Sequence, residues 1–233
     1  MKNAVILCSG GVDSVVTAHY VKKRLDYKGL IILFFDYSQK TLKSEEKFSR
    51  ICAKELQAEF IKITVKELGS ISGSLINKSE KFKGIERKAL KNTKKESEKW
   101  YVPCRNLVFL SYALALCDSL FVKKKKNYDI FIGFKNEGNE SYPDSTKEFV
   151  GQVDSIAKKS CSGKFRVIAP LIKKDKEEII QLGKRLDVEL KNTFSCYTSK
   201  KTGKHCGKCL ACMLRKEGFY WANIDDPSSY IDN

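Results

Sequence analysis

Short apolar runs alternate with helical patterns along most of this chain, and this alternation constrains its fold more than any other feature. The runs at 4–8 and 29–35 are apolar and bounded by glycine or polar residues, as buried strands are, and 59–65 alternates apolar and polar residues. The same reading gives strands at 4–8, 29–35, 59–65, 128–134 and 165–171 and helices at 15–25, 44–56, 107–121 and 176–186. Strands separated by helices pair in parallel. We therefore predict an α/β fold with a doubly wound parallel sheet, which binds ligands at the carboxyl ends of its strands.

The length of the chain limits its domain organisation. With 233 residues, the chain fits one domain and a small appendage. We expect a main unit at 1–190, with a lysine-rich insertion or mobile cover at 66–99, and a small C-terminal region at 191–233 that belongs to the same unit. No apolar run approaches the roughly 18 residues of a membrane helix, and the N-terminus lacks a signal-peptide pattern. We therefore expect a cytoplasmic protein.

The chain is strongly basic, since 44 lysines and arginines against 28 acidic residues give a net charge of +16. Much of this charge lies in lysine runs such as 123–126, and such runs are usually solvated surface. Few aromatic residues are interleaved with them, so we do not expect RNA as a partner. A basic surface does attract anionic nucleotides.

A glycine-rich loop follows the first predicted strand and opens a helix. It reads Ser9-Gly10-Gly11-Val12-Asp13-Ser14. Glycines let the backbone turn tightly, and a helix N-terminus offers unpaired N–H groups and a positive dipole end, so the loop suits phosphate. Asp13 would repel phosphate unless Mg²⁺ bridges the two or the carboxylate caps the helix. An ordinary tight turn is the alternative interpretation.

The chain has nine cysteines and no export signal, so a cluster of them indicates metal binding rather than disulfides. Four of them crowd the C-terminal region, at Cys196, Cys206, Cys209 and Cys212. Four thiolates suit a tetrahedral, structural Zn²⁺ with no open position for a catalytic water. The last three cannot share one face of a helix, so we expect a knuckle at Gly207. We expect His205 to stand outside the ligand set, and a redox dithiol pair is the alternative.

The glycine loop, in its place after the first strand, resembles the pyrophosphatase loop of the PP-loop ATPases, which split ATP between its α and β phosphates. The cysteine tail, followed by Arg215 and Phe219, resembles that of the 7-cyano-7-deazaguanine synthase (QueC) family. Segments 101–106, 142–144 and 36–39 match motifs of that family in the same order. The resemblance spans the whole chain and implies a PP-loop, HUP-like Rossmann-type domain.

The resemblance also implies a reaction. Members of the family use ATP to adenylate the carboxylate of 7-carboxy-7-deazaguanine, and ammonia then converts it, via the amide, to the nitrile preQ0, with release of AMP and pyrophosphate. The implied catalytic residues are Asp13, Ser14 and Arg105. The implied ATP and Mg²⁺ site is formed by Ser9, Gly10, Gly11, Asp13 and Ser14. The implied deazapurine site is formed by Tyr101, Arg105, Asn106, Tyr142 and Asp144. A homodimer is also implied.

Several residues on the substrate side depart from the family pattern. Ser38 and Cys104 stand where the family has glycine, and Lys135 and Gly138 replace an asparagine and an aspartate. Such changes would accompany a changed acceptor, for example a partner protein that receives a deazaguanine in an anti-phage defence system. A PP-loop tRNA-modifying enzyme and a non-catalytic binding module are further alternatives. Residues 106, 142 and 144 have a structural alternative, namely turn formation around Pro143 or helix capping.

Overall fold

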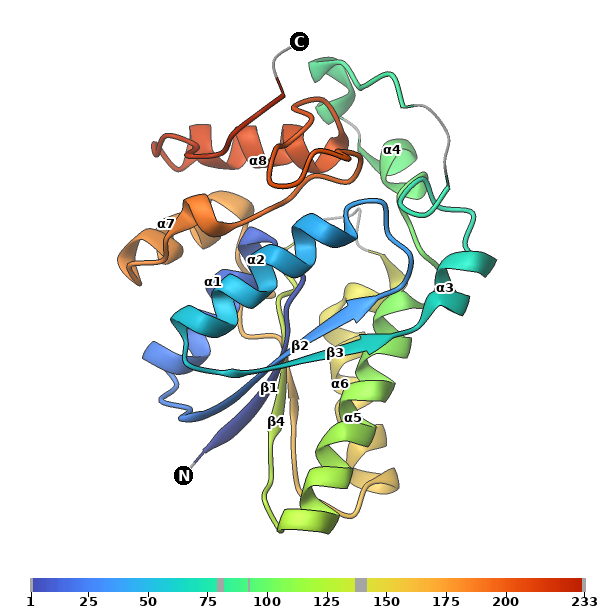
Figure 1. The fold of residues 1–233 in the computed structure, drawn as a ribbon, viewed down its shortest axis with the longest axis vertical. Coiled ribbons are helices and arrows are strands. Elements are labelled where there is room, and N and C mark those ends of the chain that lie inside the picture. The colour runs from blue at the N-terminus through green and yellow to red at the C-terminus, as the bar shows by residue number, and fades with distance from the viewer. Residues whose placement is uncertain (1, 79–81, 92, 137–141, 232–233) are drawn as a thin grey trace.

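The computed structural model describes residues 2–78, 82–91, 93–136 and 142–231, so Gly138 lies outside the described residues. Its strands are β1 (Asn3–Leu7), β2 (Gly29–Asp36), β3 (Glu59–Thr64), β4 (Asp129–Ile132) and β5 (Val167–Ile168). They form one parallel sheet in the order β3-β2-β1-β4-β5 (Figure 1). The chain runs outward from β1 to β3 and then from β4 to β5, so the order reverses between β1 and β4. This topology confirms the predicted doubly wound sheet.

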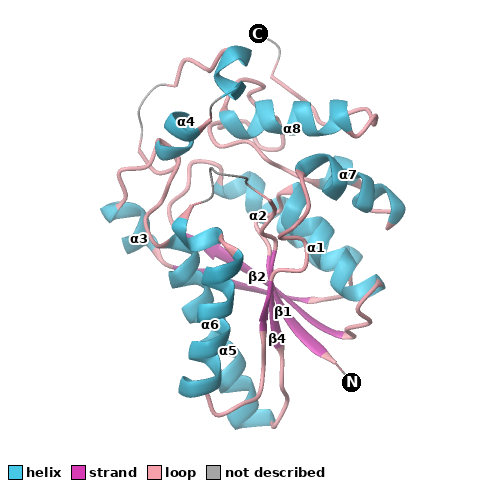
Figure 2. Ribbon diagram, turned by 180° about the vertical axis from the view of Figure 1, so that it is seen from behind, coloured by secondary structure: helices cyan, strands magenta, loops and turns pink. Residues whose placement is uncertain are grey.

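Helices cover both faces of the sheet (Figure 2). They are α1 (Val12–Lys23), α2 (Leu42–Glu55), α3 (Lys66–Ile71), α4 (Lys94–Glu98), α5 (Arg105–Lys124), α6 (Lys147–Ser160), α7 (Lys176–Arg185) and α8 (Leu210–Trp221). Short 3₁₀ turns are η1 (Arg87–Lys91), η3 (Pro143–Ser145) and η4 (Leu190–Asn192). The core under α5 and α6 lies on one side of the sheet, and the core under α1 and α7 lies on the other.

Successive residues of β1 enter these two cores in turn. Val5 and Leu7 pack in the core under α5 and α6, and Ala4 and Ile6 pack in the core under α1 and α7. Because both faces are covered, this strand is a continuous apolar run rather than an alternating one. The buried sheet thereby fixes the carboxyl end of β1, where the glycine loop begins.

Several segments differ from the sequence predictions, among them α8, where no helix was predicted. The strand predicted at 165–171 pairs only over β5; Phe165 and Leu171 are buried, but they lie outside the ladder. Helix α6 was not predicted, although the Thr146 hydroxyl caps it by accepting from the Phe149 N–H at 3.0 Å. Within 66–99, expected only as an insertion or cover, the described residues form α3, η1 and α4.

Helix α5 is, by length and composition alone, able to cross a membrane, with a mean hydropathy of 1.4. One such helix is weak evidence, because core helices of α/β domains have the same composition. In this fold Leu110, Ala113 and Cys117 of α5 are buried in the core. One face of α5 therefore packs against the sheet, and its first residue, Arg105, lies at the carboxyl edge of the sheet.

Candidate active site

The glycine loop connects β1 to α1 at the point where the strand order reverses. Gly10 has a φ of +78°. A Cβ at this position would lie 2.8 Å from the Glu45 carbonyl oxygen and 2.9 Å from the Phe48 Cβ. Glycine is therefore required here both by the backbone conformation and by the close approach of α2.

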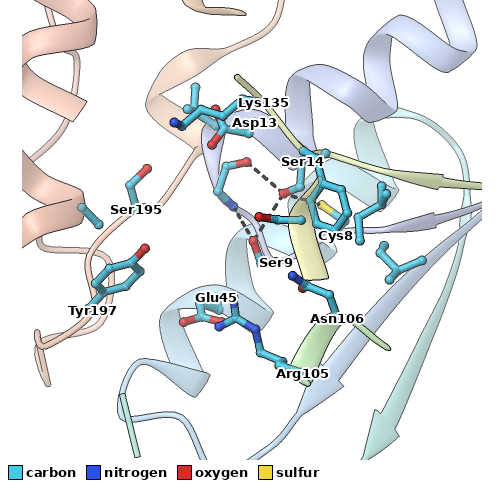
Figure 3. Close-up of a pocket in the computed structure, with 18 of the residues that line it drawn as sticks. Cys8, Ser9, Asp13, Ser14, Glu45, Arg105, Asn106, Lys135, Ser195 and Tyr197 are labelled. Atoms are coloured by element: carbon cyan, nitrogen blue, oxygen red, sulfur yellow. Dashed lines mark hydrogen bonds between the residues drawn. The ribbon is translucent and has the colours of Figure 1, made fainter. Parts of the chain in front are cut away.

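The hydroxyl groups of the loop hold its shape. The Ser14 hydroxyl donates to the Gly11 carbonyl oxygen at 3.0 Å, and the Gly11 N–H donates to the Ser9 hydroxyl oxygen at 3.3 Å (Figure 3). Helix α1 begins at Val12 without a side-chain cap. Its first N–H groups are therefore not occupied by a capping side chain and can serve an anion.

Asp13 is paired with a lysine that sequence reasoning missed. The Lys176 Nζ donates to the two carboxylate oxygens of Asp13 at 2.8 and 2.6 Å. Lys176 is the first residue of α7, which Asp175 and Glu178 cap with a capping box. The two partners are 163 residues apart in sequence, and no local pattern connects them. The loop therefore brings a carboxylate and an ammonium group together beside the predicted phosphate site.

A cavity of about 300 Å³ joins the loop to the carboxyl ends of β1, β2 and β4. Figure 3 shows Asp13 and Lys135 at one end of it and Arg105 and Glu45 at the other. Of the predicted site residues, those that line the cavity are Ser9, Gly11, Asp13, Ser14, Arg105, Asn106 and Tyr142. Gly10, Tyr101 and Asp144 do not line it. Among the described residues, the sequence analysis missed the lining residues Glu45, Lys176, Ser195 and Tyr197.

Arg105 begins α5 and points into this cavity. Its Nη1 donates to the Tyr37 hydroxyl at 3.2 Å, and its guanidinium carbon lies 5.7 Å from the Tyr37 ring centroid. Burial raises the pKa of Tyr37 to about 12, although the Arg105 charge opposes this shift. Tyr37 therefore stays neutral and positions a guanidinium whose remaining donors can bind a carboxylate or a phosphate.

Asn106 and Asp144 bind each other. The Asn106 N–H donates to the Asp144 carboxylate at 2.9 Å, and the Asn106 side-chain amide donates to the Asp144 carbonyl oxygen at 3.0 Å. Both residues are buried. Asp144 thus satisfies an N–H of the first turn of α5, which is the structural role left open by the sequence.

Tyr142 and Tyr101 form a stacked pair beside the cavity. Their ring centroids are 5.0 Å apart, with 20° between the ring planes. The Tyr142 hydroxyl donates to the Ser97 carbonyl oxygen at 2.8 Å. Tyr142 lines the cavity and Tyr101 does not, so Tyr101 packs against a residue of the cavity wall.

Two departures from the family pattern fall on left-handed backbone. Ser38 has a φ of +61° and Cys104 has a φ of +54°. Only glycine adopts this region without a steric cost, which explains the glycines that the family pattern has at these positions. The backbone here keeps the glycine conformation with other residues in place. These two departures therefore do not by themselves indicate a changed acceptor.

The four cysteines of the tail come together. Their sulfur atoms all lie within 4.8 Å of one another, and the four residues are buried. The knuckle forms as predicted, with Gly207 at a φ of +76°. Cys209 is the N-cap of α8 and Cys212 lies in its first turn. His205 stands outside the cluster, because its Nε2 accepts the Ser195 N–H at 3.0 Å.

The donor set fits Zn²⁺. Backbone N–H groups of Thr198, Ser199 and Cys206 donate to the Cys196 sulfur at 3.4, 3.3 and 3.4 Å, as they do to metal-bound thiolates. The cluster could therefore hold a tetrahedral zinc ion with four thiolate ligands.

The cysteine cluster also shapes the cavity. Residues Phe194 to Tyr197 and three residues of α8 line the cavity wall opposite α5. The fully buried Arg215 of α8 anchors this wall, since it donates to the Thr193 and Ser195 hydroxyls at 2.8 and 3.2 Å and pairs with Asp226 at 3.1 Å. The tail is thus part of the active-site wall.

The parallel sheet, the glycine loop at the switch point and the cavity beside it define an α/β nucleotide-binding enzyme of the PP-loop class. The family model of the queuosine biosynthesis protein QueC matches residues 3–223. The 7-cyano-7-deazaguanine synthase of Pyrococcus horikoshii is 33% identical over 99% of this chain and 98% of its own length. That of Hydrogenovibrio crunogenus is 35% identical over 100% of this chain and 97% of its own length.

The chain therefore belongs to the QueC family and is an ATP-dependent ligase. Among solved structures, the U34-tRNA thiolase NcsA of Methanococcus maripaludis aligns with 95% of this chain and 65% of its own chain, at 16% identity and a TM-score of 0.44.

Proposed function

We propose that this protein adenylates the carboxylate of 7-carboxy-7-deazaguanine and converts it with ammonia, via the amide, to 7-cyano-7-deazaguanine, with release of AMP and pyrophosphate. One observation carries the proposal. A single cavity has the glycine loop at one end and the Arg105 guanidinium at the other, in a chain whose relatives are named 7-cyano-7-deazaguanine synthase.

The loop end would bind ATP. Ser9, Gly11 and Ser14, which line the cavity, would present N–H and hydroxyl donors to the phosphates, and Gly10 would give the loop its tight turn. Asp13 and Ser14 offer the oxygen ligands that Mg²⁺ prefers, and Mg²⁺ bound with ATP offsets the charge of the triphosphate. Lys176 holds the Asp13 carboxylate at 2.6 Å and adds positive charge at the same place. These groups would stabilise the pyrophosphate as it leaves.

The other end would bind the acid. A carboxylate is a poor electrophile, and AMP is a good leaving group once it is attached to the acyl carbon. Arg105 can hold the substrate carboxylate bidentately and orient it toward the α phosphate, which is a positioning task. Its place at the first residue of α5, beside Tyr37, fixes its guanidinium for that task.

The deazapurine ring would lie against Tyr142 and Asn106, which line the cavity. The Tyr142 ring can stack on the base. Tyr101 and Asp144 would act through these two residues, since Tyr101 stacks on Tyr142 and Asp144 holds Asn106.

We further propose that 1–190 form the ATP-binding α/β domain and that 191–233 form the zinc-binding region of the same unit. Zinc would be structural, because four thiolates leave no open position for water. Ammonia and the deazapurine are the small-molecule partners in this proposal. A cytoplasmic homodimer is the state that we propose for the enzyme.

Mass spectrometry of the products tests this function. The protein is incubated with Mg-ATP and 7-carboxy-7-deazaguanine, with and without ammonium. We expect the nitrile, through the amide, only when ammonium is present, together with AMP rather than ADP. A protein adduct of the deazapurine would support the alternative of a partner-protein acceptor. Formation of ADP, or no acid-dependent product, would contradict the proposal.

A further inference from the structure

Two carboxylates line the cavity among the described residues, and they differ in their partners. Asp13 is neutralised by Lys176. Glu45 of α2 instead accepts from two neutral groups, the Thr41 hydroxyl and the Gln39 amide, the latter at 3.1 Å. Among the described residues Glu45 forms no ion pair, although the Arg105 charge lies near enough to act on it. A carboxylate without a direct cationic partner is unfavourable in a cavity that takes a triphosphate and an acid, unless a cation also enters it.

The two neutral donors fix the Glu45 carboxylate. The Gln39 side chain is itself held, because its Nε2 donates to the Phe35 carbonyl oxygen and its Oε1 accepts the Tyr37 N–H, both at 2.9 Å. Thr41 and Gln39 are both buried. Each oxygen of Glu45 accepts one hydrogen bond, and a carboxylate oxygen can accept two. The carboxylate is therefore oriented and can still accept from a small donor.

Glu45 lies at the end of the cavity proposed to hold the acid. Figure 3 shows its carboxylate and the Arg105 guanidinium at that end, below Ser9. Burial raises the pKa of Glu45, while the hydrogen bonds from Thr41 and Gln39 and the Arg105 charge oppose this rise. A carboxylate with a raised pKa accepts a proton more readily than an exposed one.

We propose that Glu45 binds the ammonium ion and takes its proton, which delivers ammonia to the acyl adenylate. This inference rests on the proposed function and names the residue that handles its nitrogen substrate. Ammonia is almost wholly ammonium at neutral pH, and ammonium has no lone pair with which to attack. A fixed carboxylate at the acyl end of the cavity both attracts this cation and removes its proton.

The amination step is then balanced in atoms and charge. Ammonium gives one proton to Glu45, and the freed nitrogen lone pair forms a bond to the acyl carbon. The bond from that carbon to the phosphate oxygen breaks, and AMP leaves with the electron pair. The nitrogen loses a second proton to solvent water, which leaves the neutral amide. Glu45 returns its proton to water before the next turnover, and no oxidant or reductant is needed.

The test compares two nucleophiles that attack the same acyl adenylate. Hydroxylamine is largely uncharged at neutral pH, so it attacks without prior loss of a proton and traps the adenylate as a hydroxamate. In Glu45→Gln we expect the ratio of hydroxamate to amide to rise by about 100-fold over that of the unchanged protein, in line with the contribution of a general base. Glu45→Asp should restore part of the amide.

The matched control is Glu46→Gln, the next residue of α2. Its carboxylate binds Arg50 and Lys62 outside the cavity, so its ratio should not change. An unchanged ratio in Glu45→Gln would overturn the inference, whether both products are kept or both are lost. Joint loss of both products would indicate that Glu45 binds the deazapurine or supports the fold. If the unchanged protein forms no hydroxamate from the acid and ATP, the proposed function itself fails.

Discussion

At the residue scale, the two positions with left-handed backbone give a direct prediction of stability. Replacing Ser38 or Cys104 by glycine removes the steric cost of a positive φ, and we expect each change to stabilise the fold by about 0.5–1 kcal/mol. Urea unfolding of the purified variants measures the effect. Ser111→Gly within α5 is the control and should destabilise by about 0.5 kcal/mol. A loss of stability in Ser38→Gly or Cys104→Gly would contradict this account of the departures.

Lys176 carries the second prediction at this scale. Lys176→Met keeps the length of the side chain and removes the charge that neutralises Asp13. We expect AMP formation to fall by about 10²-fold, because an electrostatic partner of the leaving phosphates is lost. Steady-state kinetics measures the change. Lys184→Met, an exposed lysine at the other end of α7, is the control and should retain full activity. Equal rates of AMP formation in the two variants would contradict a role for Lys176 in binding the phosphates.

At the element scale, the contact between α7 and α8 sets the position of Lys176. A Cβ on Gly218 of α8 would lie 2.3 Å from the Lys176 Cγ and 3.1 Å from the Ile180 Cδ1. Gly218→Ala should therefore displace α7 and lower both AMP formation and the free energy of unfolding, the latter by roughly 1–3 kcal/mol. Gly151→Ala in α6 meets nothing within 4 Å and should stabilise the fold without loss of activity. Full activity in Gly218→Ala would show that α7 can shift without consequence.

Some features of the fold and of the site could be predicted from the sequence, and others could not. The glycine loop and the cysteine tail were predictable because each is a local pattern with a defined physical role. Lys176 and Glu45 were not, because the tertiary fold alone brings α7 and α2 to the loop. The predicted strand at 165–171 was too long, since an apolar run reports burial and not pairing. For Asp144 the sequence allowed either a role in deazapurine binding or helix capping, and the motif alone does not distinguish the two. The structure shows that Asp144 caps α5.

At the scale of the whole molecule, the cysteine cluster supports the cavity wall rather than a separate module. Removal of zinc by a chelator should disorder the wall at 194–197 and abolish activity. Trp100 reports this change, because its ring lies 5.2 Å from that of Tyr197, so its fluorescence should shift as the metal is lost. The control is Cys117→Ser, which changes a buried cysteine of α5 outside the cluster; this variant should still bind zinc. Full activity of the metal-free protein would contradict the role of the tail.

The central claim is that the glycine loop binds ATP so that an acid in the same cavity can be adenylated. The most direct measurement is exchange of labelled pyrophosphate into ATP, with 7-carboxy-7-deazaguanine present and ammonium absent. We predict that label enters ATP only when the acid is present and that Asp13→Ala abolishes this exchange. Exchange that does not depend on the acid, or that persists in Asp13→Ala, would contradict the account.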